Sequence, residues 1–361
     1  MNPRPVPAPV LSSAEVPARV EDVLARFLAG KARQARAAGL PVEVADSLTR
    51  YLAAGGKRLR PQLCLAGYHA AQGDPAQLGG TLQVAASLEL FHAFALIHDD
   101  VIDQSSLRRG QPTVHCRLAA LHARSGARDG RWLGISQAIL ISDTAHAWSD
   151  ELLRTAALSQ TCRARLQDVV AAMREEVLYG QYLDLLNPLG PPADLTAALA
   201  VIRYKTAKYT VERPLHIGAV LAGADAAFCQ ALARFALPIG EAFQLRDDLL
   251  GVFGDAEVTG KSTLDDLREG KHTALLALAH QRATPVQQRH LTALVGRCDL
   301  DESAAARIRS ILEATGARTT VEEMITQRSR QAEHALSRLP AASAALDTLR
   351  TLAHLATQRI S

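Results

Sequence analysis

The stretch HDDVID, residues 98–103, closes an apolar run, VAASLELFHAFALI, that begins at residue 84. The run contains no Gly or Pro and few β-branched residues, so it predicts a largely buried helix. On a helix, Asp99 and Asp103 are four residues apart and share one face, with Asp100 beside them. Carboxylates so close together repel one another, and the C-terminal end of a helix dipole disfavours them further. Mg²⁺, which binds carboxylates, water and phosphates, suits such a cluster.

A second Asp-Asp pair lies in a similar setting much later in the chain. The stretch GEAFQLRDDLLGVFGD, residues 240–255, places Asp247 and Asp248 inside another apolar, helix-like run. A solvated acidic helix end is an adequate alternative for either cluster alone. Two such helices facing each other would form a carboxylate-walled cleft for several Mg²⁺ ions and a diphosphate, and this is the interpretation that we favour for the pair.

Composition and charge indicate a helical, globular protein. Of 361 residues, 48% are hydrophobic, 21% charged and only 4% aromatic, with Ala, Leu and Arg abundant. The net charge is +3 and no basic run is interleaved with aromatics, so we expect no nucleic-acid partner. Five cysteines without a CxxC pair indicate a reduced, cytoplasmic protein. We expect no transmembrane helix, because Glu89 interrupts the best candidate.

The periodic pattern predicts one helix after another, with no recurring strand pattern and no internal repeat. Ser12 or Ser13 is the expected N-cap of the first helix, and the polar segment 124–131 is expected to be a surface loop. Residues 1–11 are expected to be a flexible, Pro-rich tail, and residues 12–361 a single all-α domain around a central cavity. The predicted helices cover residues 12–38, 42–54, 61–72, 76–104, 113–124, 136–155, 160–186, 194–222, 226–253, 273–282, 286–296, 301–315, 317–337 and 340–358.

Basic residues cluster at several points near these acidic motifs. The Gly turn in GGKRLRP, residues 55–61, is followed by Lys57 and Arg60, which are three apart and can converge. RRGQPT at 108–113 follows the first acidic motif, and KTAKYT at 205–210 places two lysines on one helix face. Arginine and lysine are suited to binding phosphate, although an ordinary exposed helix start or simple charge balance explains each cluster alone. Together the clusters predict a site for diphosphate, magnesium and an apolar group.

With these motifs in their order along the chain, the sequence resembles a trans-isoprenyl diphosphate synthase of the polyprenyl synthetase family, of the bacterial geranylgeranyl/farnesyl type. The resemblance runs from about Gly55 to Thr273. It implies the all-α isoprenoid synthase fold, a homodimer, and Mg²⁺ as cofactor, with three ions per site. The matching motifs are GGKRLRP, HDDVID, RRGQPT, GQYLD, KTAKYT, QLRDDLLGVFGD, GK and DLREGKHT.

Residue roles follow from the resemblance, position by position. Isopentenyl diphosphate would be bound by Lys57, Arg60, His92 and Arg109. The allylic diphosphate would be bound by Arg108, Lys205, Thr206, Gln244 and Lys261, with Lys271 as an addition. The implied Mg²⁺ ligands are Asp99, Asp103 and Asp247, beside their neighbours Asp100 and Asp248, and the implied catalytic residues are Asp99, Asp103, Asp247 and Lys205.

Two positions depart from the family pattern. The fifth residue of the second acidic motif is normally Asp and here is Gly251, which weakens the expected support for the metals. Asp255, eight residues after Asp247, is not expected to replace it. In the helix at 136–155 the usual Gly before an Asp is Ser142, followed by Asp143.

Product length is predicted from the residues before Asp99. Phe94 lies five positions earlier, with Ala95 next to it, and in the family a large aromatic there limits products to about C15–C20. Simple core packing of Phe94 is the alternative. The sequence therefore predicts a prenyltransferase that makes geranylgeranyl diphosphate, with farnesyl diphosphate as the alternative product. A class I terpene cyclase and a non-catalytic partner subunit are less favoured, because the GGKRLRP motif and both acidic motifs are present.

Overall fold

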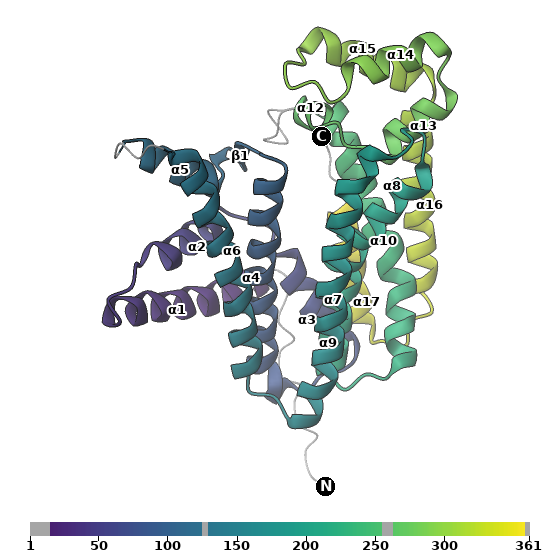
Figure 1. Ribbon diagram of the computed structural model, residues 1–361. Coiled ribbons are helices and arrows are strands. Elements are labelled where there is room, and N and C mark those ends of the chain that lie inside the picture. The colour runs from purple at the N-terminus through teal and green to yellow at the C-terminus, as the bar shows by residue number, and fades with distance from the viewer. Residues whose placement is uncertain (1–14, 125–128, 255–262, 358–361) are drawn as a thin grey trace. The chain divides into compact units, whose positions relative to one another are not determined.

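The structure is a computed structural model that describes residues 15–124, 129–254 and 263–357, and these are almost entirely helical (Figure 1). The prediction of an all-α protein is confirmed. Contacts within the chain group it into two compact units. The first comprises Met1–Leu166, Pro214–Asp225 and Ala341–Thr348; the second comprises Gln167–Arg213, Ala226–Pro340 and Leu349–Ser361.

The first unit contains the first acidic motif. Its elements begin with α1 (Val16–Ala37), α2 (Glu43–Ala53), α3 (Leu59–Ala70), the 3₁₀ turn η1 (Pro75–Gln77), α4 (Leu78–Ile102), the short strands β1 (Leu107–Arg108) and β2 (Gln111–Pro112), α5 (Val114–Arg124) and α6 (Gly130–Thr155). Two later helices cross from one unit to the other, α7 (Gln160–Leu186) and α9 (Arg213–Leu221).

The second unit contains the second acidic motif. Its elements are the rest of α7, the 3₁₀ turn η2 (Asn187–Leu189), α8 (Leu195–Val201), the π-helix η3 (Ile202–Glu212), α10 (Ala226–Phe253), α12 (Asp265–Glu269), α13 (Ala274–Arg282), α14 (Pro285–Leu294), α15 (Glu302–Ala314) and α16 (Ala317–Leu336). The final helix, α17 (Ser343–Thr357), contributes to both units.

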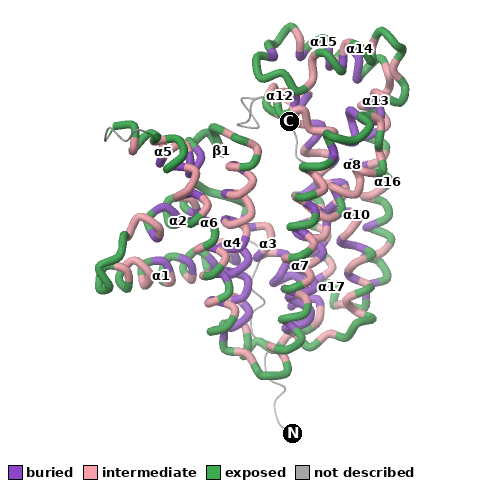
Figure 2. Tube along the Cα trace, viewed as in Figure 1, coloured by how far each residue is buried: buried purple, intermediate pink, exposed green. Residues whose placement is uncertain are grey.

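Helix α4 forms the centre of the first unit, where α1, α3 and α6 pack against it. Figure 2 shows buried positions along much of its length, as the apolar run predicted. The segment Pro75–Ile102 is the one described helix that is long and apolar enough to cross a membrane by length and composition. Of its most apolar stretch, 67% is buried inside the protein, which is typical of a core helix.

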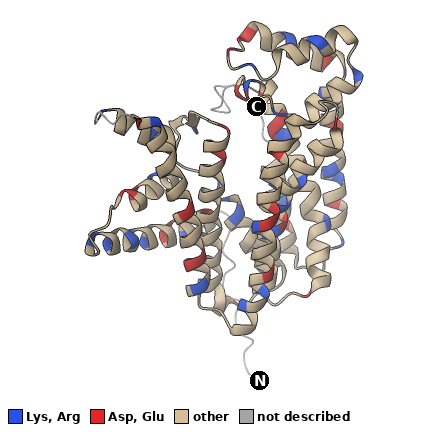
Figure 3. Ribbon diagram, viewed as in Figure 1, with Lys and Arg blue, Asp and Glu red and all other residues tan. Residues whose placement is uncertain are grey.

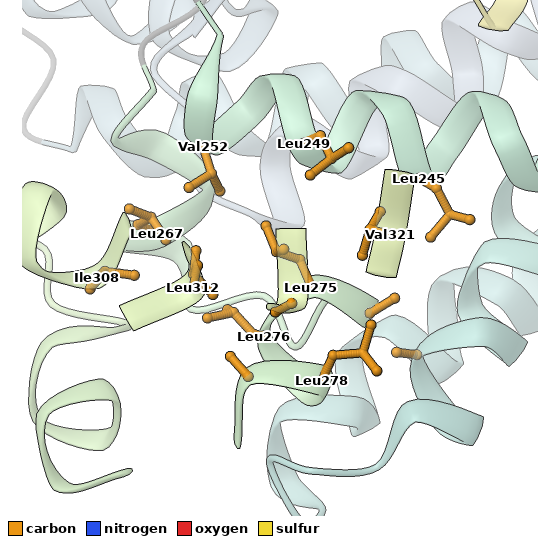
Figure 4. Close-up of a cluster of buried hydrophobic side chains, with 14 of the residues drawn as sticks. Leu245, Leu249, Val252, Leu267, Leu275, Leu276, Leu278, Ile308, Leu312 and Val321 are labelled. Carbon is orange, nitrogen blue, oxygen red and sulfur yellow. The ribbon is translucent and has the colours of Figure 1, made fainter. Parts of the chain in front are cut away.

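The core of the second unit lies between α10 and the helices that follow it. Leu245, Leu249 and Val252 project from α10 toward leucines of α13 and toward Ile308 and Leu312 (Figure 4). Helix α10 also packs against η3 and α16. In each unit, acidic and basic residues are interspersed and do not gather into one basic face (Figure 3).

The structure refines the predicted boundaries in four places. The predicted helix 194–222 is divided into α8, η3 and α9, and the helix predicted from 136 begins at Gly130. A two-stranded hairpin, with Arg108 opposite Gln111, lies between the helices predicted at 76–104 and 113–124. Helix α1 begins at Val16, with Glu15 as its N-cap and no side-chain cap. The predicted tail and N-caps Ser12 and Ser13 lie outside the described residues, and the single domain 12–361 stays a prediction.

Candidate active site

The first acidic motif ends α4, and Arg108 lies against it. Arg108 Nε donates to Asp100 Oδ1 at 2.7 Å, and its Nη2 donates to Asp99 Oδ2 at 3.3 Å. The hairpin places this guanidinium, because its turn residues Arg109 and Gly110 have positive φ angles of 53° and 71° and reverse the chain directly after Arg108. Charge balance between Arg108 and the aspartates, one of the predicted possibilities, is therefore present.

One arginine does not satisfy this acidic motif. Asp100 is 1% exposed, and its Oδ2 atom is buried without a hydrogen-bond partner. Burial raises the pKa of Asp100 to about 6 despite Arg108, and the carboxylates of Asp99 and Asp103 raise it further. The side chains described here do not bring three metal-binding groups together into a closed site. An oxygen-only donor set with an unsatisfied carboxylate oxygen fits Mg²⁺, which takes few protein ligands and retains water.

The loop of the GGKRLRP motif is held by a buried arginine. Arg58 has a left-handed backbone, with φ 47°, after Gly55 and Gly56 at φ 91° and 147°. Its guanidinium donates to Glu89 Oε2 at 3.0 Å and to the Leu52 carbonyl at 2.6 Å. Because Arg58 is 5% exposed and Glu89 4%, this ion pair fixes the loop to the middle of α4. Lys57, the next residue back, is left exposed at the surface.

Cationic side chains gather around His92 on α4. Burial lowers the pKa of His92 well below its ordinary value, and the positive charges of Arg60, Arg108, Arg109 and Arg58 lower it further. His92 is therefore neutral at pH 7, in a setting suited to a polyanion. The structure brings together the predicted isopentenyl diphosphate residues Arg60, His92 and Arg109 with Arg108.

Arg109 and Tyr51 complete this basic region. The Arg109 guanidinium donates to the Gly55 carbonyl, and a Cβ at Gly56 would lie 3.1 Å from its Nη2. Tyr51 was not predicted. Its hydroxyl is buried without a hydrogen-bond partner, and burial raises its pKa in a setting that includes Arg108 and Asp100. In the sequence, the only sign that Tyr51 belongs to this region is its position six residues before Lys57.

Phe94 lies in a cluster of aromatic rings on the first unit. Its centroid is 5.2 Å from that of Phe91, 4.9 Å from His98 and 5.0 Å from His146 of α6. Ser142 Oγ donates to the Phe94 carbonyl at 2.8 Å and lies 2.7 Å from His98 Nδ1. The serine that departs from the family pattern therefore joins α6 to the turn of α4 before Asp99. Ala95, the other predicted length-determining residue, is half-buried next to Phe94.

In the second unit, η3 and α10 form a hydrogen-bonded chain. Thr206 Oγ1 donates to Gln244 Oε1 at 2.7 Å, and Gln244 Nε2 donates to Asp248 Oδ1 at 2.8 Å. Three predicted residues are thus connected in series. Burial raises the pKa of Asp248 to about 7; the Gln244 bond lowers it, and the carboxylates of Asp266, Asp247 and Asp184 raise it.

Two glycines allow η3 to approach its neighbours closely. A Cβ at Gly180 of α7 would lie 2.6 Å from Lys205 Cα, and a Cβ at Gly240 of α10 would lie 2.9 Å from the Ala207 carbonyl oxygen. Side chains at either position would push η3 away. The glycine of GQYLD therefore positions the KTAKYT motif, and π-helical turns of this kind occur frequently at functional sites.

The two lysines of KTAKYT face α7 but bind different carboxylates. Lys205 Nζ lies 2.7 Å from Asp184 Oδ2. Lys208 pairs with Glu176, two helical turns away from Asp184, and Glu176 also accepts from Arg213. Lys205 is thus linked to the site by Asp184, whereas Lys208 belongs to a structural ion-pair network.

The remaining predicted lysines lie after the second acidic motif. Lys271 Nζ is 2.7 Å from Glu269 Oε2, at the end of α12. Lys261 lies outside the described residues. The first acidic motif and the GGKRLRP loop belong to one unit, and the second acidic motif, Lys205, Thr206 and Gln244 belong to the other. That the two acidic helices face each other stays a prediction.

Comparison with known proteins identifies the class. Residues 42–314 match the family model described as polyprenyl synthetase. The all-α fold and its two acidic motifs are those of a prenyltransferase of the trans-isoprenyl diphosphate synthase class. The chain belongs to the polyprenyl synthetase family.

Individual relatives narrow the activity to short-chain prenyl diphosphate synthesis. The geranylfarnesyl diphosphate synthase of Aeropyrum pernix is 34% identical over 81% of this chain and 86% of its own length. The farnesyl diphosphate synthase of Geobacillus stearothermophilus is 34% identical over 72% of this chain and 84% of its own length. The crystal structure of the geranylgeranyl pyrophosphate synthase from Corynebacterium glutamicum, complexed with isoprenyl diphosphate and magnesium, is 40% identical, with a TM-score of 0.92 over 97% of this chain and 100% of that chain. The predicted prenyltransferase and fold are confirmed.

Proposed function

We propose that this chain condenses isopentenyl diphosphate with allylic diphosphates to make geranylgeranyl diphosphate, with Mg²⁺ as cofactor. The contacts of the half-buried Phe94 with three other rings, one turn before the first acidic motif, support a short product. A ring in this position would limit elongation. The similarity to a geranylgeranyl pyrophosphate synthase at 40% identity supports the same product. Farnesyl diphosphate is the alternative, favoured by the Geobacillus relative.

In the first unit, isopentenyl diphosphate would bind to Lys57, Arg60, His92 and Arg109. Arginine provides two parallel donors to a phosphate, and lysine provides a compact charge. The neutral imidazole of His92 can donate one hydrogen bond without adding charge to a strongly cationic region. The Arg58–Glu89 pair would keep this loop preformed, which lowers the entropic cost of binding.

In the second unit, the allylic diphosphate would be held by Lys205, Thr206 and Gln244, together with Arg108 of the first unit, Lys261 and Lys271. The chain from Thr206 through Gln244 to Asp248 orients these side chains relative to the second acidic motif. Lys205 would exchange part of its contact with Asp184 for a phosphate oxygen. Positioning of this kind is how a protein contributes to reactions of a charged leaving group.

The carboxylates of Asp99, Asp103 and Asp247, supported by Asp100 and Asp248, would hold Mg²⁺, with three ions per site. Bound Mg²⁺ supplies electrostatic stabilisation of the departing diphosphate. Arg108 and Lys205 would stabilise the same charge while the allylic C–O bond breaks. The isopentenyl double bond then attacks the allylic cation, and the proton is lost to the departed diphosphate. Exclusion of water from the site would protect the cation.

Product analysis tests this proposal. Purified protein would be incubated with Mg²⁺, labelled isopentenyl diphosphate and, separately, C5, C10 and C15 allylic diphosphates. Dephosphorylated products would then be sized by chromatography. A C20 alcohol from all three starters is the expected result, whereas termination at C15 would replace the proposed product with farnesyl diphosphate.

We also propose that the protein is a cytoplasmic homodimer that folds as one domain over residues 12–361. Large apolar side chains on α6 support an interface, because Trp132 and Leu140 are each 64% exposed. Light scattering should give twice the chain mass of 38.7 kDa. Leu140→Glu should shift the protein toward monomer, and a wild-type protein that is monomeric at micromolar concentration would exclude the dimer.

A further inference from the structure

Tyr51 is a half-buried residue near the end of α2, and its hydroxyl oxygen is shielded from solvent. Among the residues that the structure describes, none forms a hydrogen bond with this hydroxyl. Buried hydroxyl groups in proteins are nearly always bonded, because burial without a partner is unfavourable. Phenylalanine would pack its ring equally well at this position, so packing alone does not account for the hydroxyl of Tyr51.

Hydrogen bonds hold α2 on either side of Tyr51. One turn earlier, Ser47 Oγ accepts from Arg117 Nη2 at 2.7 Å, and Ser47 lies on the same face of the helix because it is four residues away. One residue later, the Leu52 carbonyl accepts from Arg58 Nη2 at 2.6 Å. The backbone that carries Tyr51 is therefore anchored on both sides, and the position of its side chain does not depend on a flexible loop.

Charged side chains of the hairpin and of the end of α4 lie near this hydroxyl. Among the charged groups, Arg108 acts on it most strongly, followed by Asp100 and Arg109. Burial raises the pKa of the Tyr51 hydroxyl by more than the two arginines lower it. The hydroxyl therefore keeps its proton at neutral pH and is available as a hydrogen-bond donor.

Arg109 carries a positive charge that is not paired with any described carboxylate. Its guanidinium donates to the Gly55 carbonyl, which is neutral. Arg108, by contrast, is paired with Asp99 and Asp100. A protonated hydroxyl near an unpaired guanidinium suits a ligand with several anionic oxygen acceptors, because hydrogen bonds to charged oxygens are the stronger ones. A diphosphate is such a ligand.

We infer that Tyr51 is a further substrate-binding residue, whose hydroxyl donates a hydrogen bond to a phosphate oxygen of a bound diphosphate. This inference rests on the proposed function and adds to it a neutral donor from α2. The hydroxyl gains its partner on binding, so the unfavourable burial of an unbonded group is relieved in the complex. Isopentenyl diphosphate is the expected ligand, because Arg109 is among the residues proposed to bind it. An allylic diphosphate would present the same chemical group beside Arg108.

Tyr51→Phe tests the inference, because it removes the hydroxyl and keeps the ring. The dissociation constants of isopentenyl diphosphate and, separately, of farnesyl diphosphate would be measured by calorimetry with Mg²⁺ present, together with the melting temperature without ligand. A hydrogen bond to a charged group corresponds to about ten- to a hundredfold in affinity. We expect the dissociation constant of isopentenyl diphosphate to rise by about tenfold or more, with a melting temperature no lower than that of wild type. A rise for farnesyl diphosphate instead would support the same role toward the allylic diphosphate.

Tyr68 of α3 provides the matched control, because it is 1% exposed and its hydroxyl donates to the Asp74 carbonyl. Tyr68→Phe should lower the melting temperature and leave both dissociation constants unchanged, which is the reverse of the result expected for Tyr51→Phe. Tyr51→Leu, which also lacks a hydroxyl, takes the place of Tyr51→Phe if that variant does not fold. Unchanged dissociation constants for both diphosphates would overturn the inference.

The same binding measurements separate this inference from the proposed function. If wild type binds neither diphosphate and does not incorporate isopentenyl diphosphate, the proposed function fails, and the role of Tyr51 fails with it. If wild type binds both diphosphates and turns them over, but Tyr51→Phe binds them equally well, only the role of Tyr51 is wrong.

Discussion

Arg108 Nε donates to Asp100 Oδ1 at 2.7 Å, yet the pKa of Asp100 is still raised to about 6 by burial. The arginine offsets only part of the cost of burying this carboxylate beside Asp99 and Asp103. Asp248 in the other unit has a pKa of about 7 for the same main reason. In each acidic motif, the negative charge of the carboxylates is therefore only partly balanced by the protein's own positive charges.

The first prediction concerns pH and Mg²⁺. Between the ordinary aspartate pKa of 3.8 and the raised values, the folded protein binds more protons than the unfolded chain. The free energy of unfolding of metal-free protein should therefore fall as pH rises through this window, with a slope of about 1.4 kcal/mol per pH unit for each such carboxyl group. Mg²⁺ binds the ionised form, so it should raise the melting temperature more at pH 8 than at pH 5. Matched NaCl is the control for ionic strength, and equal Mg²⁺ effects at both pH values would contradict the prediction.

The second prediction concerns the buried pair of Arg58 and Glu89. Glu89→Ala removes the buried partner of Arg58 and leaves only the exposed Glu21, whose Oε1 lies 3.3 Å from Arg58 Nε, so it should cost about 3 kcal/mol in urea unfolding. The double change Arg58→Met with Glu89→Leu should lose much less, because both charges are removed. Arg297→Gln, at an exposed pair with Asp299, is the control and should leave the midpoint unchanged. A Glu89→Ala protein as stable as wild type would show that the pair does not anchor the loop.

The third prediction concerns the close contact between Gly180 and η3. A methyl group there would lie 2.6 Å from Lys205 Cα, so Gly180→Ala should displace the π-helix and cost about 1–3 kcal/mol in stability. We also expect a raised KM for the allylic diphosphate, because Lys205 and Thr206 move with η3. Gly79→Ala, at a helical glycine with open space around it, should be neutral or stabilising. Unchanged stability and KM in Gly180→Ala would show that η3 tolerates the shift.

Much of the fold could be predicted because the helices have strong apolar periodicity and few interruptions. The α4 run and its carboxylates were recognisable from residues 84–103 alone. The π-helix was not, since residues 202–212 have an ordinary helical composition and the close approach of this segment to Gly180 and Gly240 is set by the tertiary structure. Helix periodicity reports which face is buried but not how close the neighbouring backbone comes.

The site was predicted where residues are close in sequence or match a motif, and missed where tertiary structure supplies them. Arg58 lies inside the GGKRLRP motif, but its buried bond to Glu89 depends on the fold. Tyr51 had no distinguishing pattern, and Asp266 begins DLREGKHT but had no predicted role. The effect of Ser142 also needed the structure, because its bond to the Phe94 carbonyl joins two helices.

The fourth prediction concerns product length. Phe94→Ala removes a ring that contacts Phe91, His98 and His146, which opens space below the first acidic motif. Products should therefore become longer than those of wild type by at least one C5 unit, measured by chromatography after dephosphorylation. Phe27→Leu is the control, because the Phe27 ring contacts Trp148 instead and products should keep their length. Unchanged products from Phe94→Ala would make Phe94 a packing residue only.

The proposed prenyltransferase activity is tested most directly by the incorporation of labelled isopentenyl diphosphate. Wild type, Asp99→Asn and Asp247→Asn would each be assayed with C5, C10 and C15 starters, with and without Mg²⁺. Asp22→Asn, an exposed change on α1, is the control for general effects of losing a carboxylate. We predict Mg²⁺-dependent incorporation by wild type and Asp22→Asn, and a loss of about a hundredfold or more in each motif variant, since the proposed function needs the carboxylates of each motif to hold Mg²⁺. Full activity in either motif variant, or no incorporation by folded wild type with any starter, would contradict a two-motif prenyltransferase.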